Sequence, residues 1–136
     1  MVGDALVQEL GRHWEQGWNG EDVDTIMAPY APDVVFSSPF VERVSGDPER
    51  TTITGYDAVR EYVAASLRRV PGIRYTLDAT YAGTDGVVLL YTVHLPDGTD
   101  RTGADVMRLD GSGKIVDWRC HYSAFTPADT DHLMRD

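Results

Sequence analysis

A single carboxylate stands in the middle of an apolar, strand-like segment, where it could act on a bound molecule. The segment runs from Gly103 to Leu109, and the two-residue repeat of a strand places Asp105 on the same face as Gly103, Met107 and Leu109. Burial of that face would disfavour the charged carboxylate and raise the pKa of Asp105. Asp105 could then be a protonated acid that donates a hydrogen bond at neutral pH. The alternatives are a buried structural hydrogen-bond acceptor and an aspartate that faces water.

Other groups able to donate or exchange protons follow on the next strand-like segment. The same repeat places Trp118, Cys120 and Tyr122 on one face, which we expect to line a cavity together with Asp105. Tyr122 and Tyr30 could donate phenolic hydrogen bonds to a carbonyl group or to Asp105, although buried tyrosines also commonly bond to the backbone. Cys120 is the only cysteine, and we interpret it as a packing residue rather than a nucleophile.

Aromatic residues are numerous enough to form the walls of such a cavity. Trp14, Trp18, Tyr62 and Trp118 would suit a flat or polycyclic apolar ligand. The alternative is that these side chains are core residues, because tryptophans on the apolar stripe of a helix usually serve packing.

The elements that must position these residues are helices in the first half of the chain and strands in the second. Apolar residues repeat at spacings of three and four in segments that we predict to be helices: 4–18, 22–30 and 57–70. Shorter apolar runs bounded by Gly- and Pro-containing turns are predicted to be strands: 34–37, 51–54, 73–82, 87–95, 99–109 and 114–123. This order predicts an α+β domain, with helices packed on one face of a curved antiparallel sheet. We expect residues 1–125 to form one domain and 126–136 a polar tail.

Composition narrows the classes of partner and compartment. The chain has 136 residues and a formal net charge of −10, which argues against nucleic acid and anionic membranes as partners. A single cysteine permits no intrachain disulfide, and the most apolar stretch, 87–93, is too short to span a bilayer. We therefore expect a cytoplasmic protein. No pair of histidines has the spacing of metal ligands, and no motif implies a cofactor.

The order of four segments resembles the nuclear transport factor 2-like superfamily, and within it the SnoaL-like and ketosteroid isomerase branch. The segments are 14–26, 30–39, 53–59 and 104–109, and the resemblance covers about residues 5 to 123. It implies a cone-shaped, cystatin-like fold in which helices close one side of a curled sheet around a deep pocket. It also implies a homodimer formed through the outer face of the sheet. This fold hosts isomerases, dehydratases, cyclases, epoxide hydrolases and non-catalytic binding modules, so the resemblance indicates the fold more narrowly than the reaction.

The resemblance also transfers individual residues. In the ketosteroid isomerases a protonated aspartic acid donates to an oxyanion, and its position falls on Asp105. The isomerase base, an aspartate just before a proline, falls on Ser38, and the supporting tyrosine falls on Trp14, whose indole donates a hydrogen bond without releasing a proton. Limonene epoxide hydrolases have an arginine where this chain has Gly103, while Arg101 shares that face nearer the strand end. Steroid isomerisation is therefore not expected, and polyketide cyclases, which use a pocket aspartate, are more similar.

The resemblance further selects a face of the segment 87–95, both faces of which are apolar. It favours the face of Val88, Leu90, Thr92 and His94 as the cavity wall. His94 could then serve as the base, oriented by an aspartate across the cavity. The alternative is a solvated histidine at the end of a strand.

The leading hypothesis is a cofactor-independent SnoaL-like enzyme of the isomerase, cyclase or dehydratase type. It would bind a small hydrophobic carbonyl compound and use Asp105, with His94 or Tyr122, for proton transfer. Contacts with this compound are expected from a wider set of side chains: Trp14, Trp18, Tyr30, Ser38, Tyr62, Arg101, Met107, Trp118 and Cys120. The alternatives are a non-catalytic pocket for such a compound and a dimerising module whose cone is filled by its own aromatic side chains.

Overall fold

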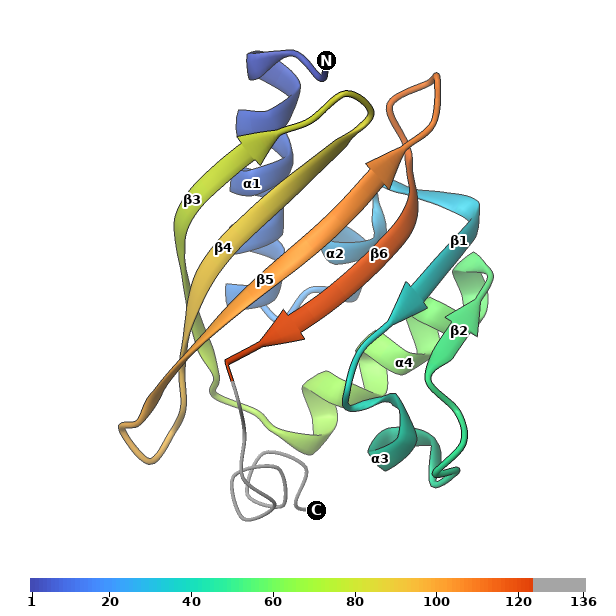
Figure 1. Cartoon of the computed structure of the whole chain (residues 1–136). Coiled ribbons are helices and arrows are strands. Elements are labelled where there is room, and N and C mark those ends of the chain that lie inside the picture. Colours follow the sequence, from blue (N-terminus) through green and yellow to red (C-terminus); the bar gives the residue numbers. More distant parts are fainter. Residues whose placement is uncertain (124–136) are drawn as a thin grey trace.

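The structure is a computed structural model that describes residues 1–123 as helices packed on one sheet (Figure 1). The elements follow in this order: α1 (Asp4–Asn19), α2 (Val23–Met27), β1 (Tyr30–Ser37), α3 (Val41–Ser45), β2 (Thr52–Thr54), α4 (Tyr56–Arg69), β3 (Arg74–Ala82), β4 (Gly86–His94), β5 (Asp100–Leu109) and β6 (Ile115–Tyr122). The predicted α+β class is confirmed, with the long helices before the long strands. The tail predicted at 126–136 lies outside the described residues.

The strands form one sheet in the order β2-β1-β6-β5-β4-β3. Strands β3 to β6 make the predicted antiparallel meander, joined by short turns (Figure 1). Strand β1 departs from the prediction, because it pairs parallel with β6, with Phe36 opposite Trp118. The sheet is therefore mixed. The alternation of residues in a strand specifies which face is buried, but not whether a strand far along the chain pairs in the parallel or the antiparallel direction. A parallel pair also needs a long crossover connection, for which the sequence carries no local signal.

Helices α1, α2 and α4 lie on the same face of the sheet (Figure 1). Helix α1 buries the stripe that its spacing predicts, including Val7, Leu10 and Trp14. Gly11 lets this helix approach β3 closely, because a Cβ atom added there would lie 2.8 Å from Leu77 Cδ2. The close approach brings Trp14 directly over the sheet, where it can reach groups on β4 and β5.

The two central strands bury one face each, and for β4 this is the face that the sequence analysis rejected. On β5 the residues that alternate with Asp105 are buried as predicted. On β4 the buried residues are Val87, Leu89, Tyr91 and Val93, so the selection of the His94 face was wrong. Register gives the reason: Leu89 lies opposite Asp105, and residues directly opposite each other in a sheet share a face.

Candidate functional site

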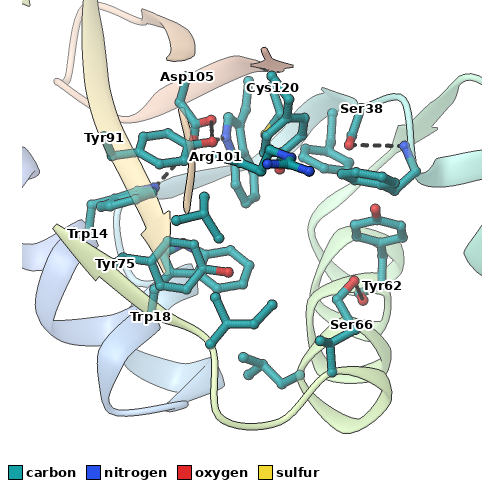
Figure 2. Close-up of a pocket in the computed structure, with 18 of the residues that line it drawn as sticks. Trp14, Trp18, Ser38, Tyr62, Ser66, Tyr75, Tyr91, Arg101, Asp105 and Cys120 are labelled. Atoms are coloured by element: carbon teal, nitrogen blue, oxygen red, sulfur yellow. Dashed lines mark hydrogen bonds between the residues drawn. The ribbon is translucent and has the colours of Figure 1, made fainter. Parts of the chain in front are cut away.

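A cavity of about 100 Å³ lies between the sheet and helices α1 and α4 (Figure 2). Most of the predicted site residues line it: Asp105, Tyr122, Trp14, Trp18, Ser38, Tyr62, Arg101, Trp118 and Cys120. The structure thus brings together residues from both ends of the chain, as the resemblance implies. Three predicted site residues do not line this cavity.

His94 lies outside the cavity, on the outer face of the sheet, where its side chain is 39% exposed. Its Nδ1 is 2.9 Å from Asp100 Oδ1, and its Nε2 is 2.8 Å from Thr76 Oγ1. The prediction that His94 faces Asp105 across the cavity was wrong, because the period of β4 turns His94 away whenever Tyr91 points inward.

Tyr30 and Met107 are core residues rather than cavity walls. Tyr30 is 4% exposed and stacks on Trp118, with ring centroids 4.6 Å apart. Met107 is 3% exposed and lies on the buried face of β5, beyond Asp105 from the cavity. Both predictions identified the buried face correctly but placed these two side chains too near the ligand space.

Asp105 sits at the sheet end of the cavity and is held by three side chains from three elements (Figure 2). The indole Nε1 atoms of Trp14 on α1 and Trp118 on β6 each donate to Oδ2 at 3.0 Å. The phenol of Tyr91 on β4 donates to Oδ1 at 2.8 Å. Asp105 itself is 1% exposed, so the carboxyl group is separated from water by its own donors.

The electrostatics of the cluster shift Asp105 toward its neutral form. None of the three donors carries a charge that could offset a carboxylate, and burial raises the pKa of Asp105 above its ordinary value. Hydrogen bonds from Trp118, Tyr91, Cys120 and Trp14 oppose this rise without reversing it. Burial likewise raises the pKa of Tyr91 and of Cys120, and the charge of Asp105 adds to both shifts.

Tyr91 is the cluster member that the sequence analysis missed. It lies directly opposite Gly103 in the β4–β5 register, two residues from Asp105 along the strand. A Cβ atom on Gly103 would lie 2.5 Å from Tyr91 Cε2 and 2.7 Å from its hydroxyl oxygen, so the phenol ring occupies the space above the glycine. Gly103 thus allows the ring to reach along the strand to Asp105. An aromatic residue opposite a glycine across a hairpin could have indicated this contact, but only once the register of the two strands was known.

The other polar groups of the cavity differ in how fully they are engaged. Ser38 Oγ accepts a hydrogen bond from the backbone N–H of Phe40 at 3.3 Å, which stabilises the turn after β1. Burial raises the pKa of Tyr62 to about 12, against hydrogen bonds with Ser38 and Ser66. The indole Nε1 of Trp18 is buried and has no hydrogen-bond partner among residues 1–123. A ligand atom able to accept a hydrogen bond would satisfy it.

Glu21 also lines the cavity, although the sequence analysis did not single it out. Its Oε1 accepts a hydrogen bond from the backbone N–H of Gly72 at 3.0 Å. Its φ of 52° is the only positive value among the described non-glycine residues. Side chains other than glycine adopt this left-handed conformation at some cost, and such residues are concentrated at functional sites. Of the described residues that line the cavity, Glu21 and Asp105 are the carboxylates.

The matched family is consistent with this geometry. The family model described as the SnoaL-like domain matches residues 11–118, which include the helices, β1 and the Asp105 cluster. The chain belongs to the SnoaL-like family. No curated protein sequence matches it.

Solved structures place this SnoaL-like chain among proteins of the same fold. A SnoaL-like protein of unknown function from Burkholderia thailandensis is 27% identical, with a TM-score of 0.78 over 91% of this chain and 100% of that one. An NTF2-like protein of unknown function from Burkholderia pseudomallei is 21% identical, with a TM-score of 0.74 over 96% and 98% of the two chains. A candidate isomerase of the SnoaL-like family from Agrobacterium tumefaciens is 17% identical, with a TM-score of 0.70 over 88% and 99%. The NTF2-like, ketosteroid isomerase-like fold inferred from the sequence is therefore confirmed.

Residues 1–123 contain neither a cluster suited to a metal ion nor a helix suited to a membrane. No group of three or more His, Cys, Asp or Glu side chains in this part of the chain is placed to hold a metal ion. No helix within the same residues has the length and apolar character needed to cross a membrane.

Proposed function

We propose that this SnoaL-like protein binds a small hydrophobic carbonyl compound and catalyses proton transfer at the carbon next to the carbonyl group. Reactions of the isomerase, cyclase and dehydratase types share this step. The observation that carries the proposal is Asp105, a fully buried acid at the end of an aromatic cavity, hydrogen-bonded only by uncharged donors. A neutral acid in a dry site can stabilise the negative charge that develops on a carbonyl oxygen when the neighbouring carbon loses its proton.

The size of the cavity limits the compound. A cavity of about 150 Å³ holds one benzene molecule, and this one has about 100 Å³. A polycyclic ligand, which the aromatic composition suggested, would have to displace several core rings. This space is smaller than the benzene-sized cavity, so a short chain can be enclosed, whereas a compound with one ring fills the space and extends past Glu21 and Arg101, which also line the cavity.

Proton transfer also needs an acceptor, and we assign it to Glu21. Ser38 stands where the isomerases have their base, and its hydroxyl is engaged in the turn before Phe40. Glu21 is the remaining carboxylate among the described lining residues, and the Gly72 N–H fixes one of its oxygens while the other stays available. The reaction then balances: Glu21 takes the proton from carbon, and the resulting enolate oxygen receives hydrogen bonds at the Asp105 end.

The direct test is exchange of α-hydrogens for deuterium in small ketones such as cyclopentanone, cyclohexanone and acetophenone, followed by NMR in D₂O. We expect the wild-type protein to accelerate exchange in at least one ketone. Asp105→Asn should slow that exchange by about 100-fold or more, because an amide cannot supply the acidic proton. The exposed Asp33→Asn serves as the matched control and should leave the rate unchanged. An Asp105→Asn protein that exchanges as fast as wild type would contradict the proposal.

Glu21→Gln tests the acceptor separately. Glutamine keeps an oxygen for the Gly72 N–H and the length of the side chain, but it cannot take up a proton at neutral pH. Exchange should therefore fall by about 100-fold while ligand affinity changes little. Loss of binding and exchange together would indicate that Glu21 shapes the cavity entrance instead of accepting the proton.

A non-catalytic pocket for the same class of compound is the second candidate function. Ser38 favours the non-catalytic function. It occupies the position of the isomerase base, its hydroxyl is engaged in a turn, and a serine there cannot act as a base as an aspartate does. Ketones that bind to the wild-type protein without any α-exchange would support this function over the first.

A further inference from the structure

We infer that Tyr91 is the residue that contacts the carbonyl oxygen of the bound compound, and that Asp105 is a positioning residue behind it. This inference rests on the proposed function for its chemistry, although its central test measures binding alone. It names a contact that neither the resemblance nor the sequence pattern supplies.

Hydrogen-bond accounting at Asp105 leaves one place for its proton. Oδ2 already accepts two indole N–H groups, from Trp14 and Trp118, and an indole N–H only donates. A proton on Oδ2 would have to displace at least one of these bonds. The oxygen Oδ1 faces the hydroxyl of Tyr91 at 2.8 Å, and a phenol hydroxyl both donates and accepts. The Cys120 thiol, which also hydrogen-bonds to Asp105, is only a weak donor and acceptor. The neutral carboxyl group therefore carries its proton on Oδ1 and donates it to the stronger acceptor, the hydroxyl of Tyr91.

This direction of the bond frees the proton of Tyr91. When Asp105 is ionised, Tyr91 donates to it and has no proton left for another acceptor. When Asp105 is neutral, Tyr91 accepts from it and must direct its own hydrogen elsewhere. The bond to Asp105 is the only one that the described residues offer to the Tyr91 hydroxyl, and Tyr91 lines the cavity. An oxygen atom of a ligand in the cavity can then accept the hydroxyl hydrogen of Tyr91. Only hydrogen bonds change in this rearrangement.

Gly103 is what permits the arrangement. Tyr91 reaches Asp105 by lying across the glycine, in space that any side chain at 103 would fill, starting with a Cβ atom 2.5 Å from the ring. Figure 2 shows the Tyr91 ring beside Asp105 and above Trp14, with its hydroxyl directed at the carboxyl group. The phenol is thus held between the acid and the ligand space, as a relay of hydrogen bonds requires.

The test uses 4-fluorophenol, a one-ring compound whose neutral hydroxyl oxygen can accept a hydrogen bond as a carbonyl oxygen does, and 4-fluorotoluene, which has a methyl group in place of the hydroxyl. Fluorine NMR titration gives the affinity and the chemical shift of each bound compound. Tyr91→Phe keeps the ring and removes the hydroxyl, and we expect it to weaken 4-fluorophenol binding by about 10-fold to 100-fold. Binding of 4-fluorotoluene should change less than about 2-fold, because it makes no hydrogen bond.

Asp105→Asn distinguishes a positioning role from direct contact. The amide oxygen can accept from both indoles while the amide N–H donates to the Tyr91 hydroxyl, so this variant should bind 4-fluorophenol within a few-fold of wild type. Weak binding by Asp105→Asn combined with normal binding by Tyr91→Phe would overturn the inference and make Asp105 the ligand contact. Normal binding of 4-fluorophenol by Tyr91→Phe overturns it in any case.

The dependence of 4-fluorophenol affinity on pH tests the role of Asp105 further, because a purely structural role would not make this affinity depend on the ionisation of Asp105. In the wild type the affinity for 4-fluorophenol should fall as Asp105 ionises with rising pH, whereas the Asp105→Asn profile should stay flat until the phenol itself ionises. Burial raises the pKa of the tyrosines and the cysteine on which the charge of Asp105 also acts: Tyr30 on β1, Tyr75 on β3, Tyr91 on β4, and Cys120 and Tyr122 on β6. The charged groups that line the same cavity, Glu21 and Arg101, are common to both proteins. A difference between the two profiles therefore belongs to Asp105, and identical profiles would overturn its role.

Failure of this inference and failure of the proposed function give different results. Exchange that depends on Asp105 but not on the Tyr91 hydroxyl would keep the function and overturn the contact. A wild-type protein that exchanges no ketone but binds 4-fluorophenol through Tyr91 would keep the contact and overturn the function. A wild-type protein that binds neither fluorinated compound would overturn both.

Discussion

Two effects compete at Asp105, and the direction of its pKa shows which prevails. Loss of water around a fully buried carboxylate can raise its pKa by about 3 to 5 units, while each hydrogen bond to the charged form lowers it. Three donors reach the carboxyl oxygens of Asp105, yet its pKa remains above the ordinary value of 3.8. Uncharged donors orient the group without supplying the opposite charge that would hold it ionised. The residue therefore keeps its proton to a higher pH than an exposed aspartate does.

The stability of the protein should record this proton. Because the pKa of Asp105 is raised on folding, its contribution to stability is complete below about pH 3.8 and is lost as the pH rises through the folded-state pKa. Asp105→Asn cannot ionise. As the pH rises from 3.8 through the folded-state pKa, its free energy of unfolding should therefore increase relative to that of the wild type, by about 1.4 kcal/mol per unit of pKa rise. Urea unfolding of both proteins from pH 3 to pH 9 measures the difference. The other carboxylates are shared, so parallel curves would mean that Asp105 is not held neutral.

At the scale of elements, side chains of helix α1 satisfy backbone hydrogen-bonding groups of β3 that no neighbouring strand pairs. Strand β3 is an edge of the sheet, and edge strands present unpaired backbone groups. The Asn19 side chain accepts from the Tyr75 N–H at 2.7 Å and donates to the Tyr75 C=O at 2.8 Å. Glu15 accepts from the Leu77 N–H. Because Tyr75 lines the cavity, these contacts fix one of its walls as well as the edge of the sheet.

Asn19→Leu should therefore destabilise the protein although the residue is not in the core. Loss of both hydrogen bonds leaves the N–H and C=O of Tyr75 unsatisfied, at a cost of about 1 to 3 kcal/mol in the free energy of unfolding. Gln16→Leu, an exposed position on the same helix, should change stability by less than about 0.5 kcal/mol. Urea unfolding compares the two. An equal effect of both substitutions would mean that the contact with β3 contributes nothing specific.

The fit of Tyr91 over Gly103 can be measured as a coupling between β4 and β5. Gly103→Ala forces the ring to move and should destabilise the wild type by about 1 to 3 kcal/mol. In a Tyr91→Leu background the ring is absent, so the same substitution should cost much less. The four proteins form a double-mutant cycle, and we expect a coupling energy of about 0.5 to 3 kcal/mol from urea unfolding. Additive effects would show that the glycine does not serve the tyrosine.

Local patterns in the sequence predicted most helices and strands. They did not predict how the strands pair or which face of β4 points inward. Helical stripes and Gly-containing turns specified α1, α4 and the β3–β6 meander, and alternation on β5 and β6 predicted that Asp105 and Trp118 are buried together. The inward face of β4 could not be predicted because both faces are apolar, so His94 was chosen and Tyr91 was missed. The short helix α3 was not predicted, since five residues carry too little pattern to detect.

At the scale of the whole molecule, aromatic packing leaves only a small space inside the cone. Ring centroids lie 4.4 Å apart for Trp14 and Tyr91 and 4.4 Å apart for Phe36 and Trp118. The protein is thus intermediate between an open cone with a large pocket and one that its own side chains fill. This accounts for our expectation of a one-ring compound, and it makes the cavity sensitive to any ring that shifts.

The outer face of the sheet concerns the assembly of the whole molecule, and we propose that it forms a homodimer with a second copy. Register places Tyr81, Val88 and Val106 side by side across β3, β4 and β5, and Arg119 follows on β6. Tyr81 is 57% exposed and Val106 is 40% exposed, so this row presents apolar surface to solvent. Apolar side chains gathered on an exposed face favour an interface, and a twofold dimer brings the same face of two copies together.

Sedimentation velocity tests the dimer. We expect the wild-type protein to sediment at twice its chain mass of 15.1 kDa, and more completely as salt screens the net charge of −10 that each copy carries. Val106→Glu adds a charge at the centre of the row and should give a monomer with an unchanged circular dichroism spectrum. Ala5→Glu, at an exposed position on α1, is the control and should remain dimeric. The proposal fails if the wild type stays monomeric at all salt concentrations, or if Val106→Glu associates as tightly as the control, because the apolar row would then have no role in assembly.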